Sequence, residues 1–259
     1  MLARYALTLC VALFLVSGSR AQQSTEPPPP VAAPRASIMA EELPRAGAIV
    51  VFGADRPLGV EIVKALAGLN KQVTAVIREG SDRAAFEALK VDVTTVDPLV
   101  ADRLKEMFAA APLRAVVAPF DVSDEPMLGL DAARNIIEVT KATGVPRFVL
   151  VSATGAGDSR DVVPWYVSLL RSDAFAAANA AEEHLKSAGL DFTIVRAGWI
   201  IDEEPTGTAA IAEGAPAFSW IANGDLARIV AGTVDAKALS GRTATVVDPQ
   251  RASLLSVLF

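Results

Sequence analysis

The chain has 259 residues, and 52% of them are hydrophobic, which is ample material for a sizeable buried core. Its formal charge of -6 argues against nucleic acid as a partner, because binding a phosphate backbone needs a basic face. The sequence holds a single histidine and a single cysteine, so it excludes disulfides and lacks the ligands of an ordinary zinc site.

Residues 1–21 have the pattern of a secretory signal peptide, with Arg4 near the start, an apolar stretch over 7–16 and small residues before Ala21. Cleavage after Ala21 would remove Cys10, the only cysteine. The apolar stretch is shorter than the ~20 residues of a spanning helix, which favours a cleaved signal peptide over an uncleaved membrane anchor. The anchor is the alternative. We expect a protein of the secretory pathway or an exported one, or a plastid protein that arrives through a bipartite presequence.

Residues 22–45 are rich in proline and polar residues and lack hydrophobic periodicity, which predicts a disordered linker. The folded domain is expected over 46–259. Within it, continuous apolar runs alternate with helical patterns, as in a parallel sheet covered on both faces. The expected strands lie at 48–53, 72–78, 90–93, 114–120, 147–153, 191–197 and 243–248, and the expected helices at 58–69, 81–89, 98–110, 127–144 and 170–188. We predict an α/β fold, a single Rossmann-like doubly wound parallel sheet with a small irregular cap near 198–220.

The segment VVFGADRPLG, residues 50–59, predicts the phosphate-binding turn of such a sheet. The helix that follows offers unpaired N–H groups and a positive dipole end to an anion. Gly53 fits the tight turn, Gly59 fits close packing of helix on strand, and Pro57 suits the first helical turn. The glycine usual between them is absent, and Arg56 or Pro57 stands there. Such a side chain weakens cofactor binding or, as Arg56, contacts a phosphate; a turn that merely packs is the alternative.

The second expected strand ends at Arg78. Sheets that bind NAD commonly carry Asp or Glu there to hold the ribose 2′-hydroxyl, whereas an arginine suits a 2′-phosphate. We therefore expect NADP(H) as cofactor in preference to NAD(H). The alternative is a solvated arginine at a strand end.

Three longer blocks make the chain resemble the atypical short-chain dehydrogenase/reductase superfamily, in particular its NmrA-like, NAD(P)H-binding branch, which is related to biliverdin IXβ/flavin reductase. NIIEVTKATGVPRFVLVSATGAG (135–157) is similar to a helix of that branch followed by its G-V-x-R-F-V-x-V-S strand. AAEEHLKSAGLDFTIVRAGWI (180–200) is similar to A-E-x-x-L-x-x-S-G-L-x-Y-T-I-V-R-P-G-x-L, and NGDLARIVAGTV (223–234) to an S-x-x-D-L-A helix. The resemblance covers about 48–248.

The resemblance implies a cofactor cleft at the carboxyl ends of the strands, where an open parallel sheet gathers its ligands. The first turn, the ends of the second and third strands and the end of the fourth strand would line it. The implied cofactor-binding residues are Gly53, Ala54, Asp55, Arg56, Pro57, Leu58, Gly59, Arg78, Asp92, Val93, Ala118 and Pro119.

The catalytic residues of the superfamily are largely missing. Its reductases use a tyrosine, a lysine four residues later and a serine. The resemblance places Ala174 and Ala178 at the tyrosine and lysine positions, and Ser152 at the serine position, as the one candidate catalytic residue; a serine with a purely structural role is the alternative. The spacing of Glu182 and Lys186 predicts a solvated i,i+4 pair on the helix.

Three functions remain open on these residues. The first is an NADP(H)-dependent reductase whose small quinone-, flavin- or pyrrole-type acceptor takes its proton from water. The second is a dinucleotide-sensing or scaffold protein without catalysis, which the two alanines favour. The third is a fold that retains neither cofactor nor chemistry, which the missing glycine and the predicted export favour.

Overall fold

The computed structural model describes residues 47–120, 125–212 and 218–251. The predicted signal peptide and the predicted linker lie outside the described residues. Within the described ranges, no helix has the length and apolar character needed to cross a membrane.

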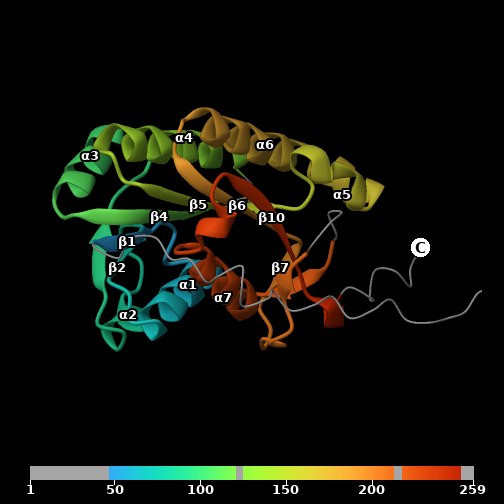
Figure 1. Cartoon of the computed structure of the whole chain (residues 1–259), viewed down its shortest axis with the longest axis horizontal. Helices are drawn as coiled ribbons and strands as arrows, with labels where there is room; N and C mark the ends of the chain where they lie inside the picture. Colours follow the sequence, from blue (N-terminus) through green and yellow to red (C-terminus); the bar gives the residue numbers. More distant parts are fainter. Residues whose placement is uncertain (1–46, 121–124, 213–217, 252–259) are drawn as a thin grey trace, which may run out of the picture. The chain divides into compact units, whose positions relative to one another are not determined.

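An eight-stranded sheet forms the centre of the domain (Figure 1). Its order is β3-β2-β1-β4-β5-β6-β10-β8, and every pair is parallel except β10 with β8. The strands are β1 Ala48–Val51, β2 Val73–Ile77, β3 Asp92–Thr95, β4 Leu113–Pro119, β5 Arg147–Ala153, β6 Asp191–Ala197, β8 Ala210–Ile211 and β10 Arg242–Val247. This order reverses direction between β1 and β4, as in nucleotide-binding sheets, and confirms the predicted Rossmann-like architecture.

Helices cover both faces of the sheet (Figure 1). Each of the two core clusters unites one sheet face with its helices: Ile49, Ile62 and Ile229 belong to one, and Val50 and Leu185 to the other. One side carries α1 Pro57–Gly68 and α7 Asn223–Thr233, and the other carries α3 Ala101–Ala109, α4 Pro126–Thr143 and α6 Ser172–Ser187. Because both faces are buried, the central strands are continuous apolar runs rather than alternating ones.

Some short elements differ from the sequence-based expectation. The predicted helix at 81–89 shortens to α2 Ala84–Glu87, and the strand predicted at 90–93 starts two residues later, as β3. The region 198–220 contains strands β7 Trp199–Ile201 and β9 Trp220–Ala222, which pair with each other, and β8. It is thus not irregular throughout. A further helix, α5 Trp165–Leu170, was not predicted, and none of its residues is buried.

Candidate functional site

A cavity of about 1260 Å³ lies at the carboxyl ends of β1, β2, β3 and β4. This is the switch point of the sheet, where open α/β sheets bind their ligands. Most of the predicted cofactor-binding residues line it, namely Gly53, Asp55, Arg56, Pro57, Leu58, Gly59, Arg78, Ala118 and Pro119. The cavity is larger than the roughly 300–1,000 Å³ of ordinary small-molecule pockets, so it has room for an extended ligand.

Three predicted cofactor-binding residues do not line the cavity. Ala54 is fully buried beneath the turn, where its N–H donates to the carbonyl of Val76 at 3.0 Å. Asp92 and Val93 lie at the start of β3, because this strand runs on to Thr95. The end of β3 contributes its last residues to the cavity in their place.

The turn before α1 is tight and leaves room for a ligand. Gly53 has a φ of +59°, and a Cβ on Gly59 would lie 2.1 Å from the Gly53 carbonyl oxygen, so both positions require glycine. The Arg56 N–H is used within the turn, donating to Gly53 at 3.1 Å. The N–H groups of Leu58 and Gly59 belong to the first helical turn and lack an acceptor within the helix. The cavity reaches both glycines, so the side chains of Arg56 and Pro57 border the hollow without closing it.

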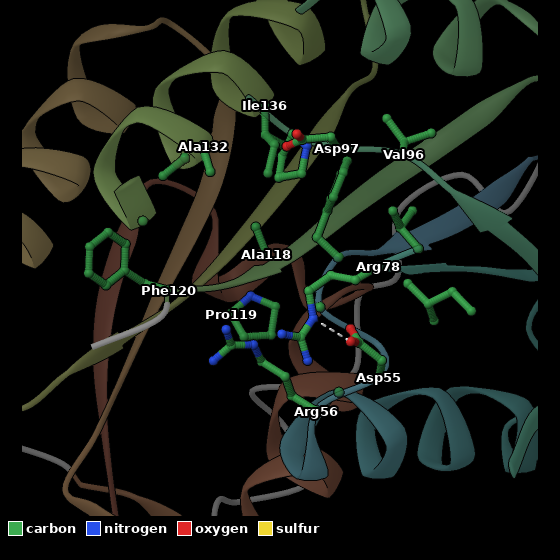
Figure 2. A pocket seen from close by; sticks show the side chains of 18 of the residues that line it. Asp55, Arg56, Arg78, Val96, Asp97, Ala118, Pro119, Phe120, Ala132 and Ile136 are labelled. Atoms are coloured by element: carbon green, nitrogen blue, oxygen red, sulfur yellow. Dashed lines mark hydrogen bonds and ion pairs between the residues drawn. The ribbon is translucent and has the colours of Figure 1, made fainter. Parts of the chain in front are cut away.

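Charged side chains gather in front of this turn (Figure 2). Arg78 Nε donates to Asp55 Oδ2 at 2.6 Å, and Ser81 Oγ donates to the same oxygen at 2.9 Å. Figure 2 shows the side chains of Arg56 and Arg78 both extending toward Pro119, above the start of α1. Two guanidinium groups beside a helix N-terminus fit the binding of a phosphorylated ligand.

Asp55 is ionised in this environment. Burial alone would raise the pKa of its carboxyl group, but the hydrogen bonds from Arg78 and Ser81, with the charge of Arg78, outweigh burial. The pKa of Asp55 therefore lies below its ordinary value. At neutral pH the carboxylate is a fixed anion at the cavity wall.

The rest of the cavity wall is largely apolar and was not predicted. Helix α4 contributes Gly129 and Ala132, and the chain after β4 contributes Phe120 (Figure 2). Ile200 and Ile201 of β7 complete this part. Small residues three apart on the expected helix at 127–144 were an available signal, but the sequence does not say which helix face meets the cavity.

Ser152 belongs to a buried cluster that does not line the cavity. Its Oγ donates to Glu182 Oε1 at 2.6 Å. Glu182 is fully buried and accepts two further hydrogen bonds from Arg196, from Nη2 at 2.6 Å and from Nε at 3.0 Å. The remaining Nη1 of Arg196 donates to Asp158. Ser152 and Arg196 are directly opposite each other on β5 and β6, so the cluster joins these two strands to α6.

The predicted i,i+4 pair of Glu182 and Lys186 on α6 is present, but the prediction that it is solvated is wrong. Lys186 Nζ lies 2.8 Å from Glu183 and 3.9 Å from Glu182, whose side chain is sealed from solvent. The two alanines at the superfamily's tyrosine and lysine positions, Ala174 and Ala178, are buried on the same helix. Among the described residues that line the cavity there is no tyrosine, lysine, histidine, cysteine or serine.

Comparisons with known proteins agree with this geometry. Residues 53–237 match the model of a family described as NAD(P)H-binding. An uncharacterized sugar epimerase of Bacillus subtilis, YhfK, is 25% identical over 207 residues, which span 75% of this chain and 91% of that protein. ChuY, an anaerobilin reductase of Escherichia coli O157:H7, has a similar fold, with a TM-score of 0.69, 23% identity, and coverage of 78% of this chain and 97% of that one. A short-chain dehydrogenase/reductase of Veillonella parvula in complex with NADP gives a TM-score of 0.64 at 13% identity, covering 80% and 96%.

Proposed function

This chain belongs to the NAD(P)H-binding family, which confirms the resemblance seen in its sequence, and we propose that it binds NADP(H) and reduces a small electrophilic acceptor. The observation that carries the proposal is the cavity at the switch point, where Arg56, Arg78 and the start of α1 border one hollow. Its size suits a dinucleotide, and the two arginines beside the helix N-terminus suit phosphates that lie against the turn.

Different residues around the turn would bind different parts of the cofactor. The first-turn N–H groups of Leu58 and Gly59 would hold the diphosphate, and the end of β3 would border the adenine. Arg78 favours a 2′-phosphate and hence NADP(H), the cofactor present in the Veillonella parvula structure. Glu79 also lines the cavity and would suit an unmodified ribose, and comparison of NADPH with NADH binding tests the preference.

The chemistry proposed for this cavity asks little of the protein's own acids and bases. A bound NADPH would supply hydride. Since the described lining residues include no tyrosine or lysine, we propose an acceptor electrophilic enough to take its proton from water. The chain's contribution is then to position the two reactants and to exclude water from the apolar part of the cavity.

The apolar lining favours a flat, largely hydrophobic acceptor of the quinone, flavin or pyrrole type. Phe120, Ile200 and Ile201 contribute to that surface. The test is oxidation of NADPH by the purified protein across a panel of quinones, flavins, enones and linear tetrapyrroles. Turnover with at least one class is expected; no oxidation with any of them would refute the reductase.

A dinucleotide sensor or scaffold is the second candidate. The burial of Ala178 and the engagement of Ser152 with Glu182 favour it, because neither position presents a reactive group to the cavity. The catalytic role of Ser152 stays a prediction. Equilibrium titration decides: NADPH binding without turnover supports the sensor, turnover supports the reductase, and no binding leaves the fold without either function.

We further propose that the protein acts in the secretory pathway or outside the cytosol, as the pattern of residues 1–21 predicts. The alternatives are a plastid and an uncleaved membrane anchor. Fractionation of cells that express the tagged full chain tests this proposal, together with the mass of the mature protein. Recovery of uncleaved protein in the cytosol would overturn it.

A further inference from the structure

We infer that Asp55 is the positioning residue for cofactor selectivity: it holds Arg78 by one side so that the outer edge of the guanidinium faces the 2′-phosphate of NADP(H). The inference rests on the proposed function and deepens it. Nothing about residue 55 in the sequence resemblance assigns it this role, because there it is one of seven consecutive turn residues.

Arg78 needs an anchor to bind a ligand in one geometry. Arg78 follows the end of β2, and its side chain is 68% exposed. An exposed arginine has rotamer entropy to lose before it can bind a ligand in one geometry. The Asp55 side chain is only 4% exposed and is fixed in the turn, so its 2.6 Å contact to Nε orients the guanidinium before the ligand arrives.

The contact with Asp55 uses only one side of the Arg78 guanidinium. A guanidinium carries five N–H groups in a planar fork, and the contact to Asp55 is made by Nε. The two terminal amino groups lie on the other side of the fork, and Figure 2 shows that end of Arg78 turned toward Arg56 and Pro119. A phosphate bound there would meet two parallel donors, which is the strong, geometrically selective mode of arginine–phosphate binding.

Asp55 also affects the electrostatics of the turn. Arg56 and Arg78 extend into the same part of the cavity, and like charges repel. The Asp55 carboxylate, ionised at neutral pH, offsets one of them and accepts from Ser81 as well. Its other oxygen, Oδ1, is buried without a hydrogen-bond partner among the described residues. A buried oxygen without a hydrogen bond lowers the stability of the fold. Such a destabilising feature at a cavity wall is expected where the residue serves binding.

A rival role for Asp55 predicts the opposite result. If the carboxylate merely neutralised Arg78, it would repel the phosphate, and replacing it by the neutral isostere asparagine would tighten NADPH binding. If it positions Arg78, the same replacement removes the charge-assisted contact, frees the arginine and weakens NADPH binding. NADH lacks the 2′-phosphate, so its binding reports on the turn itself.

The experiment measures the dissociation constants of NADPH and NADH for the full chain and for Asp55→Asn. We expect the variant to bind NADPH about tenfold more weakly, equivalent to ~1.4 kcal/mol, with the NADH constant within about twofold of the parent protein. Glu61→Gln is the matched control, because it makes the same chemical change at an exposed ion pair with Lys64 on α1, outside the cavity lining. It should leave both constants unchanged.

Three outcomes overturn the inference. An Asp55→Asn variant with unchanged or tighter NADPH binding overturns it alone, as does a parent protein that binds both cofactors without preference. A parent protein that binds neither overturns the proposed function as well. Should Asp55→Asn fail to fold, Ser81→Ala removes one support of the same carboxylate oxygen. It is expected to weaken NADPH binding about two- to threefold, and equal loss for NADH would contradict the inference.

Discussion

Two arginine–carboxylate pairs lie near the carboxyl ends of the strands, and they differ in exposure. In the Asp55–Arg78 pair the carboxylate is buried but the arginine is 68% exposed and lines the cavity. In the Glu182–Arg196 pair the side chains are 0% and 4% exposed. Arg78 therefore has N–H donors available for a ligand, whereas Arg196 donates hydrogen bonds to Glu182 and Asp158 within the protein.

The difference shows how burial decides the use of the same chemical groups. A sealed ion pair has lost its hydration, so each partner depends on the other, and removing one leaves an uncompensated charge. An exposed arginine remains hydrated and can exchange water for a ligand. Ser152 has the identity expected of a superfamily catalytic serine but donates into the sealed cluster, which is why position along the chain alone does not give its role.

The largest effect is expected from breaking the sealed pair. Glu182→Ala leaves Arg196 buried without its bidentate partner and should lower the free energy of unfolding by about 3–5 kcal/mol. Glu183→Ala is the matched control, since its side chain is 61% exposed and pairs with Lys186 at the surface; it should cost less than about 1 kcal/mol. Urea unfolding followed by circular dichroism measures both. Equal losses would contradict the contrast between sealed and exposed pairs.

The open pair is tested next, through its arginine. Arg78→Ala removes the charged donors proposed to hold the 2′-phosphate and should weaken NADPH binding by about 1.5–3 kcal/mol, roughly 10- to 150-fold, with NADH nearly unaffected. Arg134→Ala, at an exposed position of α4 that does not line the cavity, provides the control. Calorimetric titration gives the NADPH and NADH constants for the parent protein and for both variants. A parallel loss of NADH affinity would mean that Arg78 supports the turn and not the phosphate.

The shape of the open site depends on Gly59. A Cβ there would lie 2.1 Å from the Gly53 carbonyl and 2.7 Å from the Cα of Ala54, both of them backbone atoms that cannot move cheaply. Gly59→Ala should destabilise the protein by about 1–3 kcal/mol and weaken both cofactors. Gly68→Ala, later in α1 and with no atom within 4 Å of the added Cβ, should instead stabilise by about 0.5–1 kcal/mol. Thermal unfolding separates the two variants, and similar melting temperatures would count against a glycine requirement.

The smallest effect concerns pH. The pKa of Asp55 is lowered, so its contribution is present above the ordinary value near 3.8 and is lost only as the pH falls through the lower folded value. A phosphomonoester takes up its second proton near pH 6, at about the same value for every variant. The NADPH preference should thus weaken a few-fold between pH 7.5 and pH 5, and by the same factor in Asp55→Asn. A steeper fall in the parent protein would indicate that Asp55 itself titrates there.

The sequence predicted those parts of the site that local pattern determines. A buried strand followed by Gly53 and Gly59 identifies the turn, and Arg78 follows directly from the end of the second strand. The end of β3 was misplaced because this edge strand is polar and partly exposed, so its boundary carries no hydrophobic signal. The end of such a strand is determined by its pairing with β2 in the sheet.

Tertiary contacts account for the rest. Glu182 and Arg196 are fourteen positions apart on different elements, and spacing along a helix pointed instead to Lys186. The contribution of α4 to the cavity depends on how that helix rolls against the sheet. Neither relation is encoded in a short window of residues, which is why the first turn and Arg78 were predicted, whereas the contributions of α4 and β7 were not.

The two edges of the sheet bear on how the protein meets other copies of itself. β8 is only two residues long, and β3 exposes Asp92 at the opposite edge. A short strand and a charged strand are both poor templates for backbone pairing by another chain. Self-assembly through extension of this eight-stranded sheet is therefore disfavoured at both of its edges.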